Sequence, residues 1–87
     1  MKLVLIEWMD SHAGRGWQDK EKLQAAATPL YCRSVGWVVS GNKKCKVIVP
    51  HISVDSEMGA MIQGCGDLTI PTKAIVRLTI LRHRLDK

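Results

Sequence analysis

The closing stretch of the chain, residues 63–81, limits the fold more than any other segment. It reads QGCGDLTIPTKAIVRLTIL and holds two short apolar runs that only three residues, 71–73, keep apart. Apolar runs of this length, bounded by glycine and proline, are typical of β-strands. The sequence therefore predicts two strands, 67–70 and 75–81, joined by a single turn at 71–74.

Three earlier segments also carry strand signals. Residues 2–9 form a nearly continuous apolar run, which predicts a strand buried on both faces. Residues 30–40, LYCRSVGWVVS, alternate imperfectly and favour a long strand with a bend or bulge at Gly36. The GNKK sequence at 41–44 is typical of a tight hairpin turn, so residues 45–52 are predicted to return as a strand that Pro50 ends or confines to an edge.

The remaining segments predict one helix and two irregular regions. Residues 17–27 are rich in helix formers, with Trp17, Leu23 and Ala27 as the candidates for a buried stripe. Residues 54–66 show no clear period and predict a loop with one helical turn around 58–62. The tail, RHRLDK, is predicted to be frayed.

Size and composition bound the class of protein. The 87 residues, 46% of them hydrophobic, suffice for one core, so a single domain over residues 1–87 is expected. No apolar run approaches the roughly 18 residues that cross a bilayer, and Glu7 interrupts the N-terminal run too early for a signal peptide. An odd number of cysteines, three, fits a reducing compartment, and we expect a cytoplasmic protein without a membrane partner.

Positive charge is concentrated in two segments. The net charge is +5; residues 30–50 hold four basic side chains and no acid, and residues 72–87 hold five bases and one acid. If these segments share a face, they would attract a phosphate-bearing ligand. The alternative is that they are lysine-protected strand edges in solvent.

The order of the predicted elements resembles that of the SH3-like small barrels, in which the fourth strand meets the fifth through one 3₁₀ turn, here IPTKAI. The resemblance implies a mainly β fold: a five-stranded SH3-like small barrel with one short helix inserted between strands one and two. An OB-like barrel competes, but its helix normally lies between strands three and four.

The stretches EWMDSHAGRGW, CRSVGW and QGCGDLTIPTKAI together resemble small uncharacterised proteins encoded by tailed phages and prophages. This resemblance covers most of the chain and brings no established activity with it. It implies a bacterial host cytoplasm and action on host components or nucleic acid, such as an anti-defence role.

Three motifs hold residue types that could carry chemistry, but none of them predicts catalysis, a metal or a cofactor. Asp10, Ser11 and His12 have the residue types of a hydrolytic triad, but sequence neighbours on one turn do not readily form its geometry, and an Asx turn is the simpler reading. The cysteines and His51 lack a CxxC spacing, which favours buried apolar cysteines over zinc. The glycine-rich stretch 63–67 lacks the lysine of a phosphate-binding P-loop, so bends with positive φ at its two glycines are favoured.

We therefore expect a non-enzymatic protein that captures an anionic, nucleotide-like ligand, either a host-defence signalling nucleotide or a nucleic acid. Arginine and lysine would neutralise phosphate, tryptophan would stack on a base, and the DSH and QGCG loops would add polar contacts. The predicted ligand-binding residues are Asp10, Ser11, Trp17, Arg33, Trp37, Lys46, Gln63, Gly64, Lys73 and Arg77.

A second hypothesis is a protein-interaction module that docks on a host or virion protein. It would use an open strand edge or the apolar residues of the 58–62 loop. A short barrel also has exposed edges, so we expect a homo-oligomer under either hypothesis.

Overall fold

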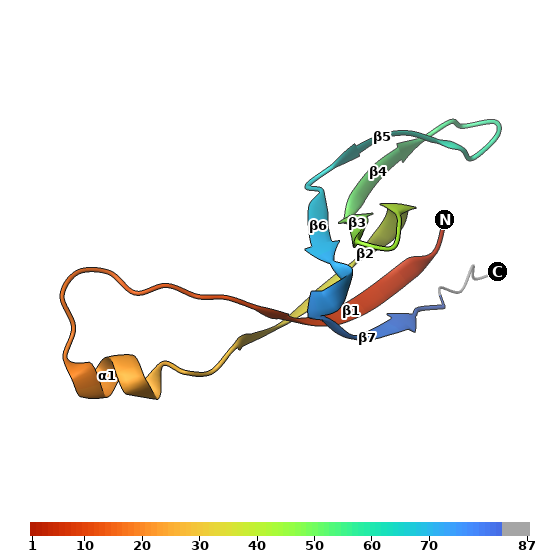
Figure 1. The fold of residues 1–87 in the computed structure, drawn as a ribbon. Coiled ribbons are helices and arrows are strands. Elements are labelled where there is room, and N and C mark those ends of the chain that lie inside the picture. Colours follow the sequence, from red (N-terminus) through yellow and green to blue (C-terminus); the bar gives the residue numbers. More distant parts are fainter. Residues whose placement is uncertain (83–87) are drawn as a thin grey trace.

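The computed structural model describes residues 1–82 and is mainly β (Figure 1). Five strands form one antiparallel sheet in the order β6-β3-β2-β1-β7, while β4 and β5 form a separate ribbon. This confirms a mainly β fold with a short helix between the first two strands, but residues 1–82 hold seven strands where five were expected. The elements are β1 (Leu3–Asp10), α1 (Lys20–Ala25), β2 (Leu30–Gly41), β3 (Cys45–Val49), β4 (His51–Val54), β5 (Met61–Cys65), β6 (Leu68–Pro71), the 3₁₀ helix η1 (Thr72–Ala74) and β7 (Ile75–Ile80).

The turn predicted at residues 71–74 is η1, and it joins the two opposite edges of the sheet. Four peptide units from Pro71 to Ile75 span at most about 14 Å, whereas the outer strands of a flat five-stranded sheet lie about 19 Å apart. The sheet is therefore curved at this corner, as Figure 1 shows for β6 and β7 around η1.

Curvature gives the sheet a concave face that holds the core. Val4 and Ile6 of β1 are buried there with Ile48 of β3 and Ile70 of β6, and Trp8 packs against them. The residues that alternate with them on β1 point to the other face and are only partly covered. The expected burial of this strand on both faces was wrong, because no described segment covers the outer face of β1 as the core covers its inner face.

The loop predicted over residues 54–66 is wrong for residues 61–65, which form β5, and the helical turn expected around residues 58–62 does not form. The flanks of the predicted loop pair as β4 and β5, from His51 opposite Cys65 to Val54 opposite Met61. The ribbon has mostly exposed side chains and a register shift after Ser53, so the alternation that marks a half-buried strand is absent. β3 ends at Val49, directly before Pro50, which is one of the two outcomes expected for this proline, and the chain continues as β4.

The helix is shorter than predicted and lies far from the core (Figure 1). None of its residues is buried, and the three candidates for a buried stripe are all exposed. The helix lies far from the core because β1 and β2 stay paired as far as Asp10 and Leu30. The segment that connects these two strands therefore begins and ends beyond the edge of the core. The predicted fraying of the tail falls mostly on residues 83–87, outside the described part of the chain.

We call residues 11–29, which connect β1 to β2, the arm. It dominates the shape of the molecule: the principal extents are 59 × 29 × 22 Å, and the radius of gyration is 17.4 Å. A compact chain of this length has a radius of gyration of about 12 Å. Within residues 1–82 no helix combines the length and the apolar character of a membrane span.

Gly36 is not the bulge that its sequence suggested, since the β2–β3 register shift falls between Val38 and Ser40. A glycine is required there because the backbone of β3 approaches closely. A Cβ added at this position would lie 2.8 Å from the carbonyl oxygen of Val49.

We expect Gly36→Ala to lower the free energy of unfolding by about 1–3 kcal/mol, because the added methyl group must displace the backbone of β3. Urea denaturation followed by circular dichroism measures this change. Gly41→Ala is the matched control in the same strand, since its nearest atoms would be 3.7 Å away. Equal stability of the two variants would contradict the close approach.

Candidate functional site

The turn between β2 and β3 presents two lysines, Lys43 and Lys44, and is built around Asn42. The side-chain oxygen Oδ1 of Asn42 accepts hydrogen bonds from the amides of Lys44 (2.7 Å) and Cys45 (3.0 Å). The Asn42 amide donates to the Cys45 carbonyl at 2.9 Å. The predicted tight hairpin is confirmed, and its geometry fixes the backbone that carries both lysines.

A third lysine reaches the same place from η1. The Thr72 amide donates to the carbonyl oxygen of Lys44 at 2.8 Å, and Pro71 pairs with Cys45. These contacts hold η1 against the hairpin turn. As a result Lys43, Lys44 and Lys73 line one open hollow of about 320 Å³ together with Pro71. We call these three residues the lysine cluster; among residues 1–82, no acidic side chain lines its hollow.

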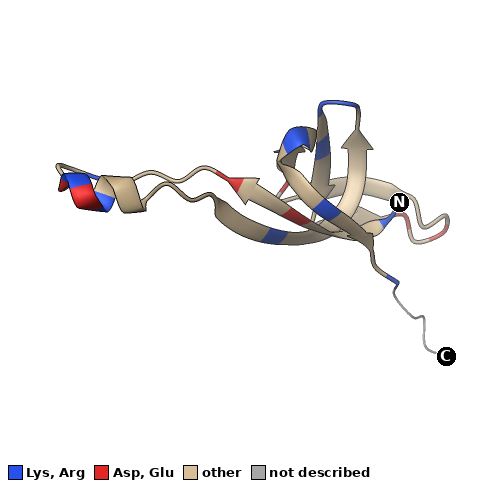
Figure 2. Ribbon diagram, turned by 60° about the horizontal axis from the view of Figure 1, so that its bottom comes forward, with Lys and Arg blue, Asp and Glu red and all other residues tan. Residues whose placement is uncertain are grey.

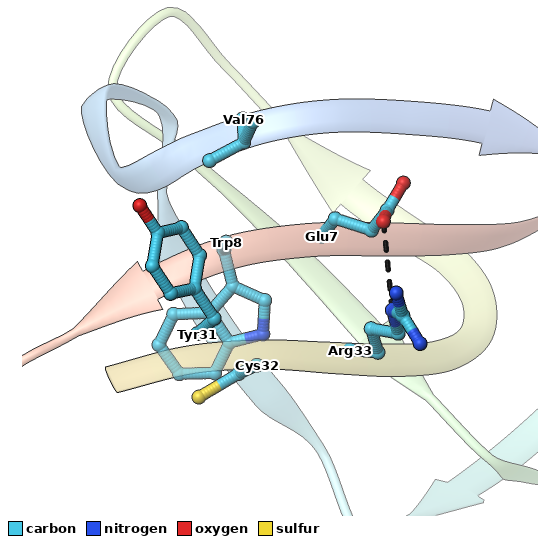
Figure 3. Close-up of a pocket in the computed structure, with 6 residues that line it drawn as sticks. All are labelled: Glu7, Trp8, Tyr31, Cys32, Arg33 and Val76. Carbon is cyan, nitrogen blue, oxygen red and sulfur yellow. Dashed lines mark ion pairs between the residues drawn. The ribbon is translucent and has the colours of Figure 1, made fainter. Parts of the chain in front are cut away.

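Two of the predicted phosphate-binding residues lie elsewhere, on the outer face of the sheet. Arg33 of β2 and Arg77 of β7 stand directly opposite Glu7 of β1. The Nε–H of Arg77 donates to Glu7 Oε2 at 2.6 Å, and Arg33 Nε lies 3.5 Å from Glu7 Oε1; Figure 3 shows the Arg33 pair. Each carboxylate oxygen of Glu7 therefore contacts one guanidinium. The single negative charge of Glu7 neutralises one of the two positive charges.

Lys46 occupies a third location. It lines a hollow of about 330 Å³ with Lys2 and the core residues Val4, Val38 and Leu78, at the open end of the concave face. The predicted cations are thus divided between the lysine cluster, the outer face and this opening. Figure 2 agrees, since its basic segments are spread over the arm, the strands and the turns.

The predicted stacking residues are also separated. Trp17 lies in the arm and is fully exposed. Trp37 lies on the outer face of β2, half-buried between Leu3 and Val49 on the neighbouring strands.

An aromatic hollow that the sequence did not suggest lies at the start of β2, next to the base of the arm. It measures about 500 Å³ and is lined by Glu7, Trp8, Tyr31, Cys32, Arg33 and Val76 (Figure 3). We call it the outer hollow. The Trp8 Nε1–H, donated to Ser34 Oγ at 3.0 Å, fixes the indole beside it. Only the strand register brings Tyr31 and Val76 together, which explains why sequence reasoning missed the site.

The polar loop residues form two further groups. The Ser11 amide donates to Asp10 Oδ1 at 2.8 Å. An Asx turn would instead use the amide two residues on, that of His12, so this contact is not the Asx turn that was expected. His12 Nε2 lies 2.6 Å from the Thr28 carbonyl oxygen and closes the base of the arm. Because a carbonyl only accepts, this nitrogen carries the proton. These residues line a hollow of about 640 Å³ within the arm.

Gln63 and Gly64 belong to β5, where the Gln63 amide donates to Ser53 Oγ at 3.1 Å. Of the two glycines expected to have positive φ, Gly66 does, with φ 81°, and Gly64 does not. Gly64 sits instead in a regular strand pair opposite Ile52. The ten predicted ligand-binding residues therefore do not share one pocket.

The cysteines are free thiols: Cys32 and Cys45 are half-buried, and Cys65 is exposed. The expectation of buried cysteines was therefore wrong, because two lie at sheet positions that are only partly covered and the third lies in the open ribbon. Within residues 1–82, no three His, Cys, Asp or Glu side chains are grouped closely enough to hold a metal ion.

The chain shows no significant match to a protein-family model, a curated protein or a solved structure.

The hydrogen bond from Arg77, with the charges of both arginines, lowers the pKa of Glu7 below its ordinary value. A lowered pKa means that the carboxylate favours folding above its unfolded pKa, and that this contribution disappears as the pH falls through the folded value. The side chain of Glu7 is 19% exposed, between two largely exposed arginines.

We expect Glu7→Gln to lower the thermal unfolding midpoint more at pH 7 than at pH 3, because the native carboxylate takes up a proton as the pH falls through its lowered pKa. Thermal unfolding of both proteins across this pH range measures the difference. Glu57→Gln, in the exposed β4–β5 turn, is the control. An equal effect of Glu7→Gln at both pH values would argue against the charged pair.

Proposed function

We propose that this protein is a non-enzymatic binding protein that captures an anionic, phosphate-bearing ligand, a nucleotide or a nucleic acid, at the lysine cluster. The observation that carries the proposal is the convergence of Lys43, Lys44 and Lys73 from two segments on one open hollow, in whose lining the described part of the chain places no acid. Like charges held together repel, and an anion relieves that repulsion.

The proposal keeps the chemistry expected from the sequence and changes the residues that perform it. Lys73 stays in the ligand-binding set. The hairpin lysines replace Arg33, Arg77 and Lys46, since the two arginines are paired with Glu7 and Lys46 faces the opening of the core.

We also propose that the curved sheet is a small SH3-like barrel. The strand order, with consecutive β6 and β7 at opposite edges and η1 between them, supports this assignment. Together with the sequence resemblance to tailed-phage and prophage proteins, it supports action in a bacterial cytoplasm, where a signalling nucleotide of host defence would be one suitable ligand.

We expect a short fluorescein-labelled single-stranded oligonucleotide to bind, measured by fluorescence anisotropy. With three cationic contacts, affinity should fall roughly 20-fold between about 50 and 200 mM salt. Replacing Lys43, Lys44 and Lys73 by glutamate should weaken binding at least tenfold. Competition with unlabelled mononucleotides distinguishes a nucleotide ligand from a nucleic acid.

The control carries the same change in charge on the arm: Arg15→Glu, Lys20→Glu and Lys22→Glu together. If both triple variants lose binding equally, the interaction reflects net charge alone, and the lysine cluster is not the site. Absence of binding by the native protein to either class of ligand would contradict the proposal.

A protein-interaction role is favoured by a different observation. The β4–β5 ribbon projects from the sheet (Figure 1) and exposes Val54, Met58 and Ile62. If it docks on a host or virion protein, Met58→Ala with Ile62→Ala should abolish recovery of that protein by affinity capture from infected cells. Retained capture by this double variant would exclude the ribbon as the docking surface.

A further inference from the structure

The arm has no core of its own. Of residues 11–29, only Gln18 is half-buried and all others are exposed. Its helix has six residues, and an isolated helix is marginal in water below about 12 residues. Ordering each residue costs about 1–2 kcal/mol of backbone entropy. An arm held in one shape therefore requires contacts that the single chain does not supply.

The exposed surface is large enough to form a stable dimer. The chain exposes 7440 Å², whereas a compact monomer of its mass exposes about 5,100 Å². The excess of about 2,300 Å² is well above the roughly 800 Å² that each partner buries in a standard interface, and it matches the scale of obligate homodimers.

The arm and the sheet offer complementary parts. The arm presents Trp17, which is fully exposed, and Leu23, which is 58% exposed. The outer hollow at the base of the arm is walled by Tyr31 and Val76, 73% and 57% exposed, and has Arg33 in its lining. An indole placed there would bury its rings against apolar and aromatic walls and stack beside a guanidinium.

We propose that two copies of this chain form a twofold-symmetric dimer in which the Trp17 side chain of each arm occupies the outer hollow of the other copy. Two arms laid side by side in opposite directions place the outer part of each beside the base of the other. That arrangement repeats the same contact twice, as a twofold interface requires. It does not depend on the lysine cluster.

Light scattering coupled to size-exclusion chromatography tests the proposal. The native protein should run as a dimer, and Trp17→Ala and Tyr31→Ala should each raise the dimer dissociation constant at least tenfold. Because both side chains are exposed in the single chain, the monomers should remain folded by circular dichroism. Met58→Ala, an equally apolar and exposed position outside the arm, should leave the dimer intact.

A mixture of the two variants makes the test specific. The heterodimer of a Trp17→Ala chain with a Tyr31→Ala chain keeps one complete contact, so it should associate more tightly than either variant alone. A native protein that is monomeric at high concentration, dimers unaffected by both substitutions, or no gain on mixing would each overturn the proposal. If the native protein is a monomer, the contacts that order the arm must come from a different partner.

Discussion

The three-residue helix η1 is the constraint on which the rest of the fold depends. It connects strands at opposite edges of one sheet, and so short a link forces the sheet to curve. Curvature creates the concave face on which Val4, Ile6, Ile48 and Ile70 are buried. The same helix, tied to the β2–β3 turn by the Thr72–Lys44 hydrogen bond, brings Lys73 to the hairpin lysines. One local element therefore determines both the core and the proposed anion site.

Much of the fold could be predicted from the sequence, because its signals are local. Glycine, asparagine and proline mark the hairpin turn and the 71–74 turn, and both lie where expected. The β4–β5 ribbon was missed because an alternating pattern arises only in a strand that buries one face. Most side chains of this ribbon are exposed on both faces, so the pattern is absent. The length of α1 was overestimated for a related reason. Helix propensity does not indicate whether a helix can pack against the core, and α1 has no buried residue.

The candidate site was less predictable, because it depends on register. Arg33 and Arg77 were expected to be free for phosphate, but both lie opposite Glu7 across two strand pairs. No property of these residues along the chain reveals that pairing. The outer hollow likewise joins Tyr31 of β2 to Val76 of β7 across the central strand. Composition suggested an anionic ligand, whereas the register of the sheet determines which cationic side chains are paired with Glu7.

The pairing of β1 with β7 has a consequence for how the chain is made. Val4 lies opposite Ile80, so nearly the whole sequence separates two neighbouring strands of the sheet. During synthesis β1 leaves the ribosome well before β7 and has an unpaired edge until β7 emerges. Contacts this distant in sequence form slowly, and an unpaired strand edge favours aggregation in the interval. Rapid folding once β7 has emerged, or protection by a chaperone until then, would limit that risk.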